Sequence, residues 1–196
     1  MLDKADRIRS KADLKEWLDY ELQKYGPSRL PDFLCLSETS ILRRHAVLLR
    51  KTEYYTNTGN WLLKNVYHLM LRRIQNRYGI HVPINCCAKG LRIVHVGPIL
   101  INSSAVVGSN CTFHINTGLV AGGTTHAAPK LSDDVVVGFG AVVLGDVCVA
   151  KGVAIGANAV VNKSIEEEYI AVAGVPAKKV SNNGSNKWGK GISTPR

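Results

Sequence analysis

The stretch Val137-Gly138-Phe139-Gly140-Ala141-Val142 returns eighteen residues later as Ile155-Gly156-Ala157-Asn158-Ala159-Val160, and this repetition decides the fold. Both copies place a large aliphatic residue first, a glycine second and an alanine fifth. A fixed period of this kind outranks local helix and strand signals because it determines the whole architecture.

A large apolar residue recurs at every sixth position over most of the C-terminal half. The series is Ile101, Val107, Phe113, Leu119, Thr125, Leu131, Val137, Val143, Val149, Ile155 and Val161, with Thr125 as its exception. Four residues after each member comes a small or β-branched residue in most hexads. The helical period of about 3.6 and the strand period of about 2 both fail to produce this spacing. The pattern predicts a triangular coil that forms one face per hexad, stacks its aliphatic residues inside and pairs each short strand with the next coil.

The N-terminal third has the patterns of three helices. Ser10 and Asp13 resemble a capping box, a second helix is expected over about 37–55, and a third is expected between Asn60 and Gly79. The third helix carries an apolar stripe that we expect to pack against the rest of the protein: Trp61, Leu62, Val66, Leu69, Met70 and Ile74. We expect a helical domain over 1–79, the coil over 80–180 and a flexible tail over 181–196.

Composition and charge narrow the function classes. The 196 residues are 45% hydrophobic and 20% charged, with no apolar run near the ~20 residues that cross a bilayer and no secretory signal, so a cytoplasmic protein is expected. Residues 1–80 hold 15 basic and 9 acidic residues, and the basic ones lie on the expected helices. This arrangement argues against nucleic acid and favours a phosphate-bearing substrate or peripheral association with an anionic membrane.

The hexad pattern resembles the hexapeptide-repeat acyltransferases. Gly90-Leu91-Arg92-Ile93-Val94-His95 and the ending Ala173-Gly174-Val175-Pro176-Ala177-Lys178 resemble the serine acetyltransferase branch and its polysaccharide O-acetyltransferase relatives. The resemblance covers roughly residues 79–180. It implies a mainly β protein, namely a left-handed parallel β-helix with a small N-terminal helical domain, that works with acetyl-CoA as a homotrimer or a dimer of trimers.

His95 interrupts the aliphatic series, since it stands one hexad before Ile101. That position places its imidazole at the inner wall or a corner of the coil, where a histidine with both nitrogens bonded would be purely structural. The resemblance instead implies that His95 is the general base, which takes the proton of an acceptor hydroxyl as it attacks the thioester of acetyl-CoA.

Two departures from the serine acetyltransferase pattern bear on the acceptor. The aspartate that orients the catalytic histidine in that branch has no counterpart in the stretch 79–83. Leu119 and Leu131 are two whole hexads apart, so the intervening residues are expected to stay nearly in register. His126, in this stretch, belongs either to the active site or to a surface loop. His114 follows an inward position and either lines a substrate cleft or lies on the exposed coil.

The resemblance also implies a groove for acetyl-CoA along a coil edge between subunits. Gly138 and Gly156, Asn162 and Lys163, and Lys178 are its expected contacts, although the glycines could be simple turns and the lysines solvated. His95, His114 and His126 could also form a zinc site of carbonic anhydrase type, but the ending favours acyl transfer and no metal is expected.

These observations favour an acetyl-CoA-dependent O-acetyltransferase that acts on a sugar hydroxyl of a surface or capsular polysaccharide, or of its precursor. Serine O-acetyltransferase is the main alternative, because the small hydroxyl-bearing amino acid is the acceptor of the resembling branch. A non-catalytic β-helix scaffold is the third.

Overall fold

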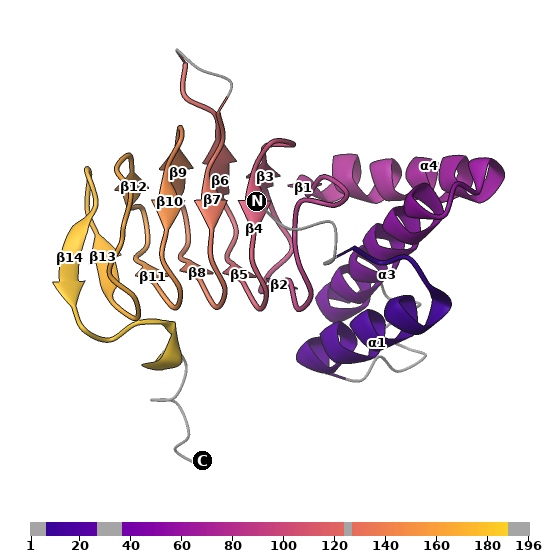
Figure 1. Cartoon of the computed structure of the whole chain (residues 1–196), viewed down its shortest axis with the longest axis horizontal. Coiled ribbons are helices and arrows are strands. Elements are labelled where there is room, and N and C mark those ends of the chain that lie inside the picture. The colour runs from indigo at the N-terminus through magenta and orange to yellow at the C-terminus, as the bar shows by residue number, and fades with distance from the viewer. Residues whose placement is uncertain (1–6, 27–36, 124–126, 188–196) are drawn as a thin grey trace.

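The computed structural model describes residues 7–26, 37–123 and 127–187. Helices gather at one end, and a stack of short strands extends away from them (Figure 1). The helical elements are α1 (Lys11–Leu22), the 3-10 helix η2 (Gln23–Tyr25), α3 (Glu38–Asn57) and α4 (Trp61–Tyr78), with the 3-10 helix η3 (Ser185–Lys187) near the C-terminus. Within the described residues, no helix is long and apolar enough to cross a membrane.

The helix boundaries follow local signals in the sequence. Ser10 caps α1 as expected, because its hydroxyl accepts from the Asp13 N–H while the Asp13 carboxylate accepts from the Ser10 N–H. Gly79 ends α4 in the left-handed conformation, with φ at 73°. The first strand begins at the next residue, Ile80, so the chain passes directly from helix to coil.

The strands form three faces of a parallel β-helix, which confirms the expected fold class. The first face holds β1 (Ile80–His81), β3 (Ile99–Ile101), β6 (Thr117–Val120), β9 (Val142–Leu144) and β12 (Val160–Val161). The second holds β4 (Val106–Val107), β7 (Lys130–Leu131) and β10 (Cys148–Val149). The third holds β2 (Arg92–Ile93), β5 (Thr112–Phe113), β8 (Val136–Val137), β11 (Ala154–Ile155), β13 (Ala171–Ala173) and β14 (Lys178–Ser181).

The aliphatic series fills the interior of the coil, as the hexads predict. Phe113, Leu119, Val137, Val143 and Ile155 are fully buried and belong to one continuous core. Burial of each such side chain contributes about 1.5–3 kcal/mol. A single coil exposes this column above and below, so the stack is stable only as a whole.

The predicted register is wrong at one end of the repeat, in the first coil. Ile93 pairs with Phe113, twenty residues later, whereas a regular coil would separate them by eighteen. The two additional residues shift the inward position from His95 to Ile93, which is 2% exposed. His95 therefore points away from the core rather than into it.

The stretch between β6 and β7 also departs from the prediction. Val107 pairs with Leu131, twenty-four residues later, while Ile101 pairs with Leu119, eighteen residues later. The stretch between β6 and β7 thus holds six residues more than a regular coil, which contradicts the expectation that it stays nearly in register. Its described ends extend from the coil next to β6 (Figure 1).

The C-terminal segment is more structured than expected, because the tail predicted from residue 181 onward includes the end of a strand and a helical turn. β14 pairs antiparallel with β13 and covers the last edge of the third face. The Ser185 N–H then donates to the Gly152 carbonyl at 2.8 Å. Residues 188–196 lie outside the described residues.

A buried ion cluster joins the helices to the first coil. Arg50 of α3 is fully buried and contacts Glu21 of α1 at 2.7 Å and Glu53 at 2.8 Å. Its guanidinium also donates to the carbonyls of Cys87 and Ala88, at 3.0 and 2.9 Å. The Glu21 carboxylate accepts from the Gly90 N–H at 2.8 Å, so charged groups of two helices are satisfied by the backbone of the coil.

The apolar stripe of α4 does not pack as expected. Ile74 is buried, but Trp61, Leu62 and Leu69 are 74%, 62% and 56% exposed. The helix turns a different side, with Leu71 and Ile74, toward α3. The stripe remains on the surface of the described chain.

We predict that Arg50→Met destabilises the protein by about 3–5 kcal/mol, because it leaves two carboxylates buried without their cation. Lys130→Gln is the matched control, since it removes a cation from the exposed pair with Asp146 and should cost less than about 1 kcal/mol. Denaturant unfolding of the variants measures both changes. Equal stabilities for Arg50→Met and the wild type would show that the cluster does not hold the helices.

Candidate functional site

His95 lies at an outer corner of the first coil, two residues after β2. Its side chain is 56% exposed, and the imidazole points toward the N-terminal end of α3. Of the two expected positions, the inner wall and a corner, His95 takes the corner, because Ile93 occupies the inner wall. The outward position leaves the ring accessible to a molecule in solvent.

Glu38, in the first turn of α3, holds one edge of this imidazole. Its Oε2 lies 3.2 Å from His95 Nδ1, and its Oε1 accepts from the Val96 N–H at 2.8 Å. The Val96 N–H is the main cause that lowers the pKa of Glu38, burial opposes it, and His95 lowers the pKa further. The carboxylate is therefore ionised at neutral pH.

This geometry selects the proton position on His95. An ionised carboxylate can only accept, so the neutral imidazole places its proton on Nδ1 and keeps the lone pair of Nε2 free to accept a proton. A carboxylate that orients a histidine in this way stabilises the imidazolium after proton transfer. The pair can thus act as a general base.

Glu38 is the functional residue that the sequence reasoning missed. The stretch 79–83 holds no carboxylate to orient His95. The carboxylate that contacts the imidazole belongs to α3 and lies fifty-seven positions before His95 in the sequence. The available signal was an acidic residue in a first helical turn, which is too common to identify a site.

A cavity of about 580 Å³ lies on the third face, next to the corner that carries His95. Its walls include Arg92, Val94, His114, Asp134 and Tyr169. Arg92 and Asp134 bring opposite charges to one cavity, and sequence reasoning assigned neither of them to a site. The cavity can hold a polar, zwitterionic or hydroxyl-rich molecule.

His114 lies in this cavity, next to the inward Phe113, as its position in the hexad predicts. Burial lowers the pKa of His114, and the charges of His95 and Arg92 lower it further. A mainly neutral His114 can donate or accept a hydrogen bond to a bound molecule. The structure therefore brings His95, His114 and Arg92 into one electrostatic environment.

The other expected site residues lie elsewhere. His126 lies outside the described residues. The N–H groups of Gly138 and Gly156 donate to Ile155 and Val172 carbonyls, both at 2.8 Å, so they serve the coil-to-coil ladder. A Cβ on Gly138 would lie 2.6 Å from the Ile155 carbonyl oxygen, so this glycine is required by the close approach of two coils.

Asn162, Lys163 and Lys178 are exposed at the far end of the β-helix from His95. The Ala177 N–H donates to the Val160 carbonyl at 2.8 Å, which brings the start of β14 beside the end of β12. Lys163 follows β12 on the first face and Lys178 begins β14 on the third face, and the positive charge of each can attract a phosphate group. Among the described residues, no group of three or more histidine, cysteine or acidic side chains is arranged to hold a metal ion.

The relatives and solved structures similar to this chain include several serine acetyltransferases. No family model matches the chain. The chain is 31% identical over 138 residues to the serine acetyltransferase of Salmonella typhimurium, a match that covers 66% of this chain and 50% of the relative. It therefore spans about half the length of the curated relatives it matches.

Solved structures share the fold. A serine acetyltransferase in complex with cysteine gives a TM-score of 0.66 at 22% identity, covering 87% of this chain and 71% of that one. A serine acetyltransferase from Brucella abortus strain S19 in complex with coenzyme A gives 0.63 at 22% identity, covering 89% and 70%. These similarities include the helices as well as the β-helix, because the shared region exceeds the coil.

We predict that nitrogen NMR of His95 shows the proton on Nδ1 at neutral pH, and that Glu38→Gln moves it to Nε2, since the amide NH₂ can donate to Nδ1. Because the pKa of Glu38 is lowered, its carboxylate is fully ionised above the ordinary pKa of a glutamic acid. The pairing with His95 is therefore present there and is lost as the pH falls through the lowered pKa. Glu167→Gln, at an exposed pair with Lys179, is the control and should leave the His95 signals unchanged. A wild-type imidazole protonated on Nε2 would contradict the pairing.

Proposed function

We propose that the protein is an acetyl-CoA-dependent O-acetyltransferase whose general base is His95. The observation that carries the proposal is the pairing of His95 Nδ1 with the Glu38 carboxylate at an exposed coil corner beside the cavity of about 580 Å³. Similarity to serine acetyltransferases, one of them solved with coenzyme A, supports the same reaction class.

The reaction follows from the state of the imidazole. Nε2 accepts the proton of the acceptor hydroxyl while the hydroxyl oxygen forms a bond to the thioester carbonyl carbon of acetyl-CoA. Glu38 stabilises the imidazolium through Nδ1–H. The carbon–sulfur bond then breaks, the imidazolium returns its proton to the thiolate of coenzyme A, and the products are an O-acetyl ester and the free thiol.

Acetyl-CoA is a second substrate here, and the residues present suit it. We infer that its nucleotide end lies near Lys163 and Lys178, whose positive charges complement phosphate, with Asn162 beside them. Gly138 and Gly156 keep the coil corner narrow between that end and His95, because a side chain at either position would meet the next coil. His114 would contact the acceptor in the cavity.

L-Serine is the acceptor that the relatives' names favour, and two features of the structure support it. The missing aspartate is compensated by Glu38. The cavity also holds Arg92 and Asp134, which can bind the carboxylate and ammonium groups of an amino acid. We therefore propose serine as the first acceptor to test.

A sugar hydroxyl is the second candidate. Its support is the cavity volume of about 580 Å³, which is far larger than an amino acid requires and lies in the range of ligands of drug size. A saccharide would distribute its hydrogen bonds over Asn110, His114 and Tyr169.

We further propose that the protein forms a homotrimer or a dimer of trimers, in cytoplasm, with a helical domain over 1–79 and the β-helix over 80–180. The support is the exposure of the site. His95 and the cavity lie open on a single chain, and an adjoining coil would exclude water from them.

The first test concerns the base. His95→Ala should lower kcat by about 10²–10⁴-fold, because general-base assistance of this size is lost. Glu38→Gln should lower kcat by up to about 10⁴-fold with little change in KM, since it moves the imidazole proton to Nε2 and leaves the cavity intact. Release of the thiol of coenzyme A measures both.

His81→Gln is the matched control, because His81 is an exposed histidine on β1 outside the site and its replacement should be neutral. Turnover of His95→Ala at the wild-type rate, in a protein with an unchanged circular dichroism spectrum, would exclude this mechanism and favour a scaffold role.

The second test separates the acceptors. With serine as the acceptor, we expect kcat/KM near the ~10⁴ M⁻¹s⁻¹ of an ordinary enzyme on its own substrate, and Arg92→Gln should raise KM for serine at least about 10-fold. Mass spectrometry of the product against serine and a panel of saccharides makes the comparison. Efficient acetylation of a saccharide, with serine inert, would establish the second candidate.

A further inference from the structure

The outward side of α4 is an unusual surface. It exposes Trp61, Leu62, Val66, Leu69 and Met70, by 45–74% of each side chain. At about 3.6 residues per turn these positions fall on one half of the helix circumference, opposite the buried Leu71 and Ile74. A contiguous apolar patch of this kind on a folded protein marks an interaction site.

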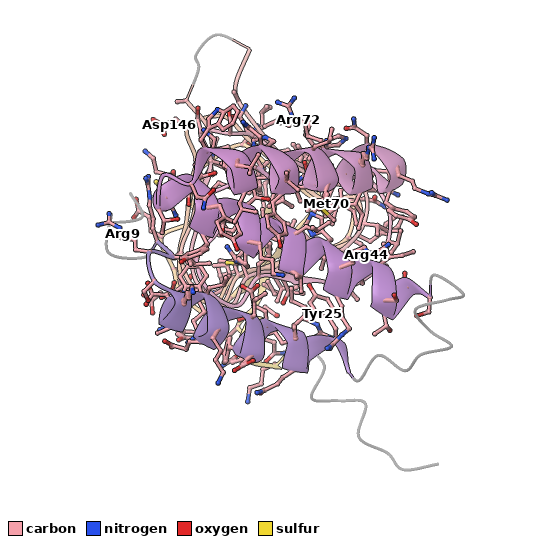
Figure 2. All side chains as sticks on the ribbon, turned by 90° about the vertical axis from the view of Figure 1, so that its right-hand side faces the viewer. Arg9, Tyr25, Arg44, Met70, Arg72 and Asp146 are labelled. Atoms are coloured by element: carbon pink, nitrogen blue, oxygen red, sulfur yellow. The ribbon has the colours of Figure 1, made fainter. Side chains whose placement is uncertain are left out.

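The same helix is strongly basic. α4 contains Lys64, Arg72, Arg73 and Arg77, and its eighteen residues include no acidic one. Arg72, Arg73 and Arg77 are exposed and continue the outward side beyond Met70. Figure 2 looks onto this end of the molecule, where the labelled Met70 lies between Arg72 of α4 and Arg44 of α3.

A groove beside the patch combines both properties. Between α3 and α4 lies a cavity of about 360 Å³ whose apolar walls include Ile41, Leu48 and Ile74. Its other walls include Arg44, Arg73 and Arg77. Guanidinium groups around an apolar pocket suit a ligand that carries a phosphate on a hydrocarbon chain.

Charge decides between the occupants of this surface. In a symmetric contact with a second copy, the arginines of one helix would face those of the other without acidic residues of α4 to offset them. An anionic bilayer complements the arginines and also receives the tryptophan and aliphatic side chains, which prefer the interface between headgroups and acyl chains.

We propose that the outward side of α4, together with the groove to α3, binds the surface of a membrane that contains anionic phospholipids. Trp61, Leu62 and Leu69 enter the interface, and Arg72, Arg73 and Arg77 bind lipid phosphates. The protein lies on the bilayer without crossing it. This inference stands on the surface alone and does not depend on the proposed reaction.

The test is sedimentation of the full chain with vesicles of equimolar phosphatidylglycerol and phosphatidylcholine, compared with vesicles of phosphatidylcholine alone. We expect binding to the anionic vesicles that weakens with added salt. The double variant Arg72→Gln/Arg73→Gln should bind about 30-fold more weakly, because each arginine near an anionic surface contributes roughly a factor of five. Lys11→Gln/Lys15→Gln is the matched control, since it removes two exposed cations from α1, and it should bind nearly as the wild type does.

A second variant tests insertion. Leu62→Ser/Leu69→Ser keeps every charge and should also reduce binding, and the fluorescence of Trp61 should shift to the blue on addition of anionic vesicles, a shift that Trp61→Phe removes. Equal sedimentation with both kinds of vesicle, or none by the folded wild type, would overturn the proposal. So would a serine double variant whose particle mass falls in light scattering while its vesicle binding is unchanged, because that result assigns the patch to a second copy.

Discussion

The buried guanidinium of Arg50 is the interaction on which the arrangement of helices and β-helix depends. It pairs with carboxylates of α1 and α3 and with backbone carbonyls of the first coil, all out of contact with water. A buried cation is tolerated only when its partners surround it, so the helices can dock in one orientation. That orientation brings Glu38, at the other end of α3 from this cluster, to His95. The candidate general base thus depends on a contact twelve residues away along the same helix.

The candidate base His95 lies where the coil is irregular, while the regular hexads stabilise the stack. A regular hexad directs its aliphatic residue inward and pairs its strand with the next coil, which fixes the side chains on the outer faces, such as His114, in place. The two additional residues of the first coil turn His95 outward, and the additional hexad after β6 interrupts the first-to-second face corner. Because each coil pairs only with its neighbours, such departures remain local, and the later coils again pair strands eighteen residues apart.

Charge supports both the proposed acceptor and the proposed membrane surface. A carboxylate on the imidazole and two opposite charges in the cavity make an amino acid a reasonable acceptor, in agreement with the names of the relatives. The exposed apolar and basic side of α4 lies on the helical end of the molecule, on a different element from His95. Attachment at that side would leave the cavity on the third face open to substrates, so membrane binding and acetyl transfer do not compete for the same surface.

The β-helix could be predicted from the sequence because its aliphatic residues lie at a fixed spacing, and burial in a coil requires that spacing wherever the chain winds regularly. Phe113 is buried as predicted for this reason, and His114 is the residue that follows it. The same rule failed for His95 and for the stretch between β6 and β7, because a repeat read from the sequence does not show how many residues a corner contains. The apolar stripe of α4 was also expected to be buried and is mostly exposed. An apolar pattern predicts a buried face but does not identify the surface that covers it. Glu38, Arg92 and Asp134 could be found only in three dimensions. Their contacts join residues that the sequence separates widely, and only the docking of α3 on the first coil and the stacking of coils bring them to one place.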